Sequence, residues 1–276
     1  MPVRRVAAGL IVCGALFAFQ KPFRQYPGVE YDNFPLPQDW SEDWLARFAA
    51  GLGDDATLFG CPLIGGDTMK SPNGLIISIT ALGSVPKGEM VPRGGAAEGD
   101  VLYISGTIGD AALGLRLHRD EEKDRAWIAA LDASTRTRLL ERYQLPQPRL
   151  ALTPALQGHA HAALDVSDGL AGDLAKMLRL TGLTAVIDFT DVPLSAAARQ
   201  ALAADPALAA TILSGGDDYE ILCAIAPEEA AAFESAASAA GVAVARLGRA
   251  QAGASNPIFK DARGAIDLPT LAYEHF

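Results

Sequence analysis

The sequence is short of basic residues and has no basic cluster. Its 276 residues carry 23 lysines and arginines against 33 aspartates and glutamates, a formal net charge of −10. Because nucleic acids and anionic membranes are bound mainly through clustered lysine and arginine, this balance argues against both as partners. It leaves ATP open, since proteins can hold a nucleotide through Mg²⁺ and backbone amides.

Cysteine and histidine are also scarce, with three and four copies. Cys13, Cys61 and Cys223 are odd in number and far apart, so they give neither a disulfide framework nor a zinc spacing, which suits a reducing cytosol. His159 and His161 could share a metal on a strand, but no thiolate or third histidine lies nearby, and a solvated turn is the simpler interpretation. The sequence also lacks a Walker A motif and a kinase-type glycine-rich loop, so the common nucleotide-binding folds are not indicated.

The N-terminal segment has the pattern of a signal peptide. A basic start, Met1–Arg5, precedes a continuous apolar run from Val6 to Phe19. The run is too short to span a bilayer comfortably, and Phe17, Phe19 and Gln20 occupy the positions where a cleavage site needs small residues. The segment therefore stays ambiguous between an export signal and an aberrant start.

The most informative stretch is Leu63–Thr68, with the sequence LIGGDT, followed by an apolar run over residues 75–82. The pattern predicts a short strand that stops at two glycines and an acid, and a second strand over the apolar run. Glycines let backbone N–H groups approach an anion closely. Asp67 can hold Mg²⁺ over the same phosphate, and the alternative is a hairpin in which Asp67 caps its own turn.

A second turn of this kind is Asp165–Leu170, with the sequence DVSDGL. We expect a strand to end near Asp165 and a helix to begin at Leu170, which puts Asp165 and Asp168 on either side of the turn, within reach of a shared cation. Helix N–H groups at such a place favour phosphate. Helix capping explains either Ser167 or Asp168, but it gives no reason for two carboxylates and a serine together.

A third turn, Ser214–Glu220, has the sequence SGGDDYE. Arg93, in a Pro/Gly-rich connection over residues 85–95, either clamps a phosphate bidentately or lies at the surface. Three glycine–acid turns, one arginine and no catalytic histidine or cysteine constellation fit phosphoryl transfer better than acyl or hydride transfer. Phosphoryl transfer depends mostly on positioning and on neutralisation of charge.

Hydrophobic periodicity places the remaining elements. Residues 20–39 are predicted to be irregular, and Ser41 is predicted to cap a helix that ends near Gly60. Strands and helices alternate from residue 99 onward, which implies an α/β or α+β domain. The predicted strands are 101–105, 162–165, 185–189, 221–225 and 242–247, and the predicted helices are 111–117, 124–143, 170–181, 195–204, 207–213 and 228–240.

These motifs closely resemble those of the thiamine-monophosphate kinase family, which shares a superfamily with aminoimidazole ribonucleotide synthetase and selenophosphate synthetase. The matching segments keep the family's order across residues 35–276, and Asp217 stands where the family usually has Glu. The segments are Leu63–Thr68, Ile77–Gly83, Arg93 with Gly94, Ala96, Gly99 and Asp100, Asp165–Leu170, Ser214–Glu220 and Tyr273–Phe276.

The resemblance implies a two-domain, synthetase-like α/β (α+β) architecture with an incomplete N-terminal domain. Residues 1–34 match nothing in the family, residues 35–97 correspond to the remainder of an N-terminal ATP- and Mg²⁺-binding domain, and residues 98–276 correspond to a C-terminal α/β domain. The family's further N-terminal metal motifs have no counterpart here, so we expect a truncated or altered start. The resemblance also implies a cytoplasmic enzyme that forms homodimers, with no membrane and no nucleic acid as partner.

The implied reaction transfers a phosphoryl group from ATP to thiamine phosphate and gives thiamine diphosphate. No general base is expected, because a phosphate monoester with a second pKa of about 6 is already largely dianionic. Several Mg²⁺ ions are expected to neutralise the two polyanions. Carried over by position, the Mg²⁺ ligands would be Asp67, Asp165 and Asp168, the ATP contacts would be Gly66, Asp67, Arg93 and Ser167, and the thiamine phosphate contacts would be Asp217 or Asp218 and Tyr273.

Three alternatives stay open at this point. The chain could be another ATP-dependent enzyme of the superfamily, with a different phosphate acceptor. It could be a catalytically impaired remnant that only binds ligand, because several of the family's metal ligands have no counterpart. It could also be an exported protein, an interpretation that rests on residues 1–19 alone.

Overall fold

The computed structural model describes residues 33–36, 41–70 and 76–273. The chain divides into two compact units, Met1–Lys87 and Gly88–Phe276, so the division lies earlier in the sequence than the predicted boundary between residues 97 and 98. The signal-like segment lies outside the described residues. Among the described residues, none of the helices combines the length and the apolar character needed to span a bilayer.

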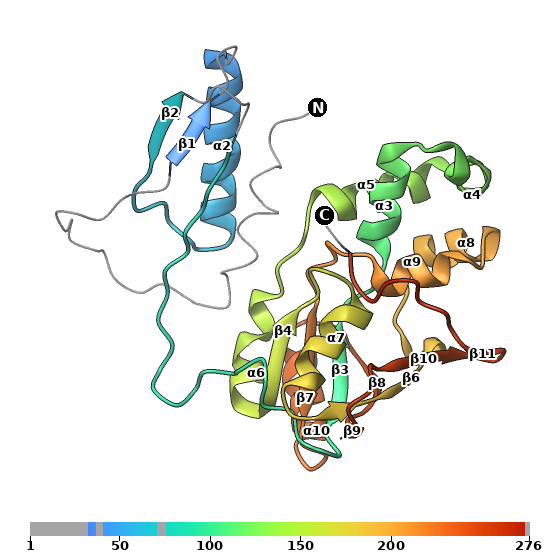
Figure 1. Ribbon diagram of the computed structural model, residues 1–276. Coiled ribbons are helices and arrows are strands. Elements are labelled where there is room, and N and C mark those ends of the chain that lie inside the picture. The colour runs from blue at the N-terminus through green and yellow to red at the C-terminus, as the bar shows by residue number, and fades with distance from the viewer. Residues whose placement is uncertain (1–32, 37–40, 71–75, 274–276) are drawn as a thin grey trace. The chain divides into compact units, whose positions relative to one another are not determined.

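The first unit is a β–α–β arrangement (Figure 1). Strand β1 (Asn33–Leu36), within the stretch predicted to be irregular, pairs in parallel with β2 (Asp67–Lys70). Helix α2 (Glu42–Leu58) connects them and begins as predicted, since Ser41 Oγ accepts a hydrogen bond of 3.2 Å from the Trp44 amide. Gly60, with φ +62, ends the helical region in a conformation that favours glycine.

Two strand predictions in this unit are wrong. The strand begins at Asp67 instead of ending before Gly65, and residues 76–82 of the apolar run predicted over 75–82 form no strand. A strand needs a neighbour to complete its hydrogen-bond ladder, and in the described part of the chain this sheet consists of β1 and β2. The run is correspondingly open to solvent, with Ile76 52% and Leu82 46% exposed.

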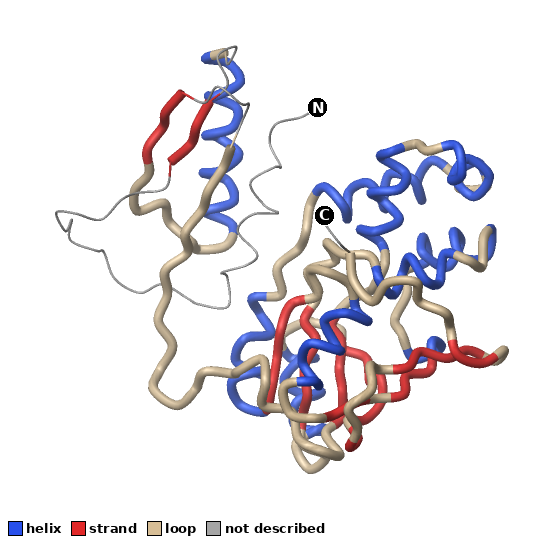
Figure 2. Tube along the Cα trace, in the orientation of Figure 1, coloured by secondary structure: helices blue, strands red, loops and turns tan. Residues whose placement is uncertain are grey.

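The second unit is built on a four-stranded antiparallel sheet in the order β4-β7-β3-β8. Figure 2 shows the strands of this unit in red among helices in blue. Two small sheets accompany it, with the orders β11-β10-β6 and β5-β9. The strands are β3 (Val101–Ser105), β4 (Ala160–Asp165), β5 (Leu183–Thr184), β6 (Val186–Asp188), β7 (Ile221–Ile225), β8 (Val244–Arg249), β9 (Gln251–Ala252), β10 (Ile258–Asp261) and β11 (Gly264–Ala265).

Helices cover both faces of this sheet. The predicted helices agree closely with the observed bounds with one exception, and the helix over Thr153–His159 was not predicted. The predicted helix over residues 124–143 is two helices, because the Asp132 carboxylate caps the second one at the Thr135 amide, 2.8 Å away. The helices are α3 (Asp110–Arg119), α4 (Arg125–Ala129), α5 (Ala133–Gln144), α6 (Thr153–His159), α7 (Leu170–Arg179), α8 (Ala196–Ala204), α9 (Leu208–Ser214) and α10 (Ala230–Ala239), with 3-10 turns at Glu122–Asp124, Leu150–Leu152 and Phe189–Asp191.

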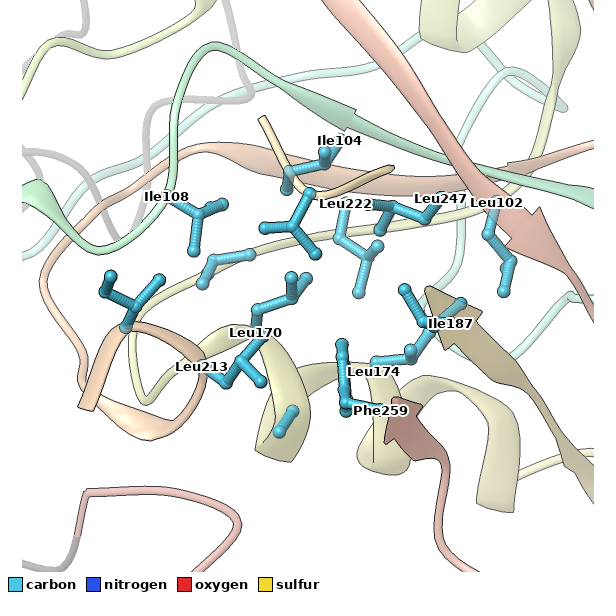
Figure 3. Close-up of a cluster of buried hydrophobic side chains, with 14 of the residues drawn as sticks. Leu102, Ile104, Ile108, Leu170, Leu174, Ile187, Leu213, Leu222, Leu247 and Phe259 are labelled. Carbon is cyan, nitrogen blue, oxygen red and sulfur yellow. The ribbon is translucent and has the colours of Figure 1, made fainter. Parts of the chain in front are cut away.

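The core has two layers, one on each face of the sheet, because successive side chains of a strand point to opposite faces. Leu102 and Ile104 of β3 belong to the larger layer, with α7, α8, α9 and β6 (Figure 3). Val101 and Tyr103 belong to the smaller layer, with α6 and α10. Burial on both faces explains the continuous apolar sequence of β3 and β7. The packed sheet in turn holds the turns at the ends of its strands in place.

Candidate active site at two paired turns

The second and third glycine–acid turns lie side by side at one end of the sheet. Asp165, the last residue of β4, is opposite Ile221, the first residue of β7. The pairing continues into the turns, where the Val166 amide donates to the Glu220 carbonyl (2.8 Å) and the Tyr219 amide donates to the Val166 carbonyl (2.9 Å). Two segments about fifty residues apart in sequence therefore form one structure.

Glycines make this close approach feasible. The Asp217 amide donates to the Ser167 carbonyl at 2.9 Å, and a Cβ on the neighbouring Gly216 would lie 2.2 Å from that carbonyl oxygen. Gly169, with φ +116, would place a Cβ 2.6 Å from the Ser214 carbonyl carbon. Gly169 and Gly216 thus allow another backbone segment to approach closely.

Asp165 has the features of a cation ligand. Its Oδ2 is buried and has no hydrogen-bond partner among the described residues. Burial raises the pKa of this carboxyl, the nearby charges of Asp173 and Asp168 raise it further, and Arg93 opposes them. Arg93 is exposed, and its segment is tied to β4 by the Ala163 amide, which donates to the Pro92 carbonyl at 3.1 Å.

The Asp168 side chain is held by a lysine. Lys176 Nζ, one turn and a half along α7, forms ion pairs with Asp168 and with Asp173, at 2.9 Å from Asp173 Oδ1. Asp173 Oδ2 accepts hydrogen bonds of 3.0 Å from the amides of both Ser167 and Asp168. The Ser167 and Asp168 amides, which precede α7, are thus occupied by a carboxylate.

Tyr273 reaches the same turn from the end of the chain. Its amide donates to the Asp168 carbonyl at 2.9 Å, and its hydroxyl accepts a hydrogen bond of 3.1 Å from Arg119 of α3. Residues 274–276 of the aromatic tail lie outside the described residues. Tyr273 is 37% exposed, and its backbone is hydrogen-bonded to the acidic turn.

The two aspartates of the third turn have different surroundings. Asp217, with φ +69, is half-buried and accepts a hydrogen bond from the Tyr219 hydroxyl at 3.3 Å. Asp218 is fully buried, and its carboxylate accepts from the amides of Gly109 (2.7 Å) and Ala111 (3.1 Å) at the start of α3. Burial raises the pKa of Asp218 to about 8, against the opposing effect of these two amides. The Asp218 carboxylate therefore points into the protein, toward the start of α3.

Glu220 is an important residue of this turn that the sequence did not single out. It is fully buried, and Arg149 donates to it from Nε at 2.7 Å while Arg142 donates at 3.1 Å. Ser105 Oγ donates to Glu220 Oε2 at 2.6 Å, and a Cβ on Gly106 would lie 2.1 Å from this carboxylate. Glu220 anchors the turn to β3 and to the segment around α5.

The structure thus assembles most of the predicted site residues. Those that lie at or beside the paired turns are Arg93, Asp165, Ser167, Asp168, Asp217 and Tyr273. Gly66 and Asp67 belong to the first unit and not to the paired turns. Within the described ranges, His, Cys, Asp and Glu side chains form no group of three or more that could hold a metal, so the ligand set of Asp67, Asp165 and Asp168 stays a prediction.

Comparison with known proteins identifies the family. Residues 97–259 match the AIR synthase related protein, C-terminal domain, and residues 29–85 match the corresponding N-terminal domain. A thiamine-monophosphate kinase of Escherichia coli strain K12 is 34% identical over 239 residues, which cover 86% of this chain and 70% of that protein. The chain belongs to the thiamine-monophosphate kinase family.

Two further members of this kinase family show how much of a relative's length the chain covers. The thiamine-monophosphate kinase of Caulobacter vibrioides is 43% identical over 204 residues, which cover 73% of this chain but 55% of that protein. The crystal structure of the Stenotrophomonas maltophilia K279a kinase matches with a TM-score of 0.73 at 34% identity, covering 85% of this chain and 72% of that one. The chain therefore spans about half the length of the Caulobacter relative, and its fold is that of the kinase family.

Proposed function

We propose that this chain catalyses the ATP-dependent phosphorylation of thiamine phosphate to thiamine diphosphate. The observation that carries the proposal is the pairing of the DVSDGL and SGGDDYE turns, which gathers Asp165, Ser167, Asp168 and Asp217 in a member of the thiamine-monophosphate kinase family. A cytoplasmic location and a homodimer, both implied by the family resemblance, are further parts of this proposal.

The acidic residues suit a bound magnesium ion. Asp165 is the best placed, because its buried Oδ2 has no hydrogen-bond partner among the described residues and carboxylate oxygen is the ligand that Mg²⁺ prefers. Asp168 would join it from the other side of the turn, and the family resemblance adds Asp67 as a third ligand. When bound, Mg²⁺ would neutralise phosphate charge, which is the main electrostatic obstacle to joining two polyanions.

The remaining residues would bind and orient the two substrates. Arg93 and the Ser167 hydroxyl would contact the phosphates of ATP, since a guanidinium pairs bidentately with phosphate oxygens. Asp217 and Tyr273 would contact thiamine phosphate, whose cationic ring suits both a carboxylate and an aromatic face. A substrate phosphate oxygen is the nucleophile and is already ionised at neutral pH, so these side chains position groups without removing a proton.

The test is ADP formation by the purified 276-residue chain, with ATP and Mg²⁺, in the presence and absence of thiamine phosphate. The Asp168→Ala variant should lose this activity, whereas Asp191→Ala, which removes an exposed acid outside the paired turns, should keep it. Turnover with another phosphate acceptor would favour a different enzyme of the superfamily. A folded chain that binds ATP without turnover would support the remnant that only binds ligand.

A further inference from the structure

Asp173 is a buried acid that the family resemblance did not single out. It is 1% exposed and lies in the first turn of α7, and its two carboxylate oxygens make different contacts. Oδ2 accepts from the amides of Ser167 and Asp168, each at 3.0 Å, and Oδ1 is 2.9 Å from Lys176 Nζ. One side chain therefore contacts the backbone of the turn and the lysine that pairs with Asp168.

These contacts differ from those of a helix cap. A capping side chain precedes its helix and accepts from amides two or three positions further along the chain. Asp173 is inside α7, where its own amide donates to the Gly169 carbonyl at 2.9 Å. Its carboxylate reaches back to amides that precede the helix, so it determines the shape of the turn and not only the start of α7.

The lysine extends this effect to a side chain. Lys176 forms ion pairs with both Asp173 and Asp168, and about a third of the Lys176 and Asp168 side chains is exposed. The sequence of contacts from Asp173 through Lys176 to Asp168 limits the orientations that the Asp168 carboxylate can adopt. The Ser167 and Asp168 amides already donate to Asp173, so they are not available to bind an incoming anion.

We propose that Asp173 is a positioning residue of the site. Oδ2 fixes the backbone that carries Ser167 and Asp168, and Oδ1 acts through Lys176 to orient the Asp168 carboxylate toward the nucleotide-bound cation. The second half of this inference rests on the proposed kinase function, whereas the first half concerns the turn itself. The two halves can be separated by substitution, because each uses a different oxygen of one carboxylate.

Three variants separate the two roles. Asp173→Ala removes both sets of contacts. Asp173→Asn keeps an oxygen that can accept from the two amides but directs an NH₂ group toward Lys176, and Lys176→Gln removes the ion pairs alone. Asp100→Ala is the matched control, because Asp100 is 2% exposed, accepts from the Ala97 amide at 2.8 Å and contacts His161 at the opposite end of the sheet.

The first measurement is amide hydrogen exchange over residues 165–170. Exchange should become about tenfold faster in Asp173→Ala, because two amides lose a charged acceptor. It should stay within about threefold of the parent chain in Asp173→Asn and Lys176→Gln, where the acceptor oxygen remains. Unchanged exchange in Asp173→Ala, or an equal increase in Asp100→Ala, would overturn the backbone role whatever the chain's activity.

The second measurement separates KM from kcat. Freeing Asp168 should weaken ground-state binding of the nucleotide and its cation, so Asp173→Asn and Lys176→Gln should raise KM for ATP about fivefold with kcat within about twofold. The side-chain role is overturned if either variant keeps the parent KM. If the parent chain shows no turnover, the proposed function is refuted but the positioning role is not. The dissociation constant of Mn²⁺–ATP is then measured in place of KM, and it should rise about fivefold in Asp173→Asn and Lys176→Gln. If Asp173→Ala does not fold, Asp173→Asn is used to test the backbone role. Amide exchange over residues 165–170 of that variant as fast as in an unstructured peptide would overturn this role.

Discussion

The turns Asp165–Leu170 and Ser214–Glu220 have similar compositions, each with glycine, serine and two or more acids, but their acids serve different ends. In the first turn, Asp165 keeps a buried oxygen with no hydrogen-bond partner among the described residues, and Asp168 is about one-third exposed. In the second turn, Asp218 and Glu220 are completely buried and bind backbone amides or arginines. The first turn contains the acids that we propose as ligands, and the second turn uses most of its acids to hold the structure together.

The difference follows from where the chain goes next. The first turn leads into α7, whose start lies at the edge of the core, so its acids remain partly exposed. The second turn leads straight into β7, a central strand of the sheet that is buried along its whole length. An acid carried toward the middle of a sheet must be paired or hydrogen-bonded, because an isolated buried charge is very costly. Burial therefore separates the structural acids of the second turn from the acids of the first turn that we propose as ligands.

The largest expected effect is on Glu220. Replacing it with alanine leaves Arg142, which is 5% exposed, and the partly buried Arg149 without their shared carboxylate. Breaking a buried ion pair from one side typically costs about 3–5 kcal/mol, so we expect a loss of that size in the unfolding free energy measured with urea. Glu228→Ala, at an exposed position, should change it by less than about 0.5 kcal/mol. Equal losses in the two variants would contradict the structural role.

Asp165 should show the opposite balance. Asp165→Asn removes a charge whose burial raises the carboxyl pKa, so the unfolding free energy should stay constant or rise by up to about 1 kcal/mol. The loss of an anionic ligand should nevertheless lower thiamine-phosphate-dependent ADP formation by about a hundredfold. Parallel measurements of urea unfolding and turnover check both parts. A variant that is strongly destabilised, or fully active, would place Asp165 with the structural acids.

Asp218 should impose a pH dependence on stability. Its pKa is about 8 in the folded protein, because of burial, and 3.8 is the ordinary value expected on unfolding. Between these values the folded state holds a proton that the unfolded state has lost, so the unfolding free energy falls as pH rises and the loss is complete above about pH 8. From pH 5 to pH 7 the decline approaches about 2.5 kcal/mol.

The comparison that isolates this effect is between slopes. Asp218→Asn cannot titrate, so its unfolding free energy should decline less between pH 5 and pH 7, whatever its absolute stability. Urea unfolding at several pH values supplies both curves. Identical slopes would mean that Asp218 stays ionised in the folded protein, held by the amides of Gly109 and Ala111.

Local patterns made much of the second unit predictable. Strand Ile221–Ile225 and the start of α7 at Leu170 follow from apolar runs bounded by glycine and acidic residues, which are features of neighbouring positions. The strand predicted over residues 75–82 failed because strand formation depends on a pairing partner elsewhere in the chain. The break in the helix over 124–143 was missed because the sequence does not distinguish an aspartate that caps a helix, such as Asp132, from one on the surface of a helix.

The site shows the same limit. The motifs predicted Asp165, Ser167 and Asp168 as site residues, and the structure places all three at the paired turns, while their roles stay predictions. The sequence could not divide Asp217 from Asp218, because these neighbours differ only in which one points at the start of α3. Asp173 was also missed. An acid in the first turn of a helix is commonplace, and its contacts with the Ser167 and Asp168 amides exist only in the folded turn.

The smallest of these effects is expected at Gly216, which joins the two turns. An alanine Cβ would lie 2.2 Å from the Ser167 carbonyl oxygen, a backbone atom that can move only if the paired turns separate. Gly216→Ala should therefore cost about 1–2 kcal/mol of unfolding free energy in urea. Gly158→Ala is the matched control in α6, where a Cβ meets nothing within 4 Å, and it should stabilise the protein by about 0.5–1 kcal/mol. If both substitutions stabilise, the turns are not packed against each other, and the acids of the first turn do not depend on the second for their position.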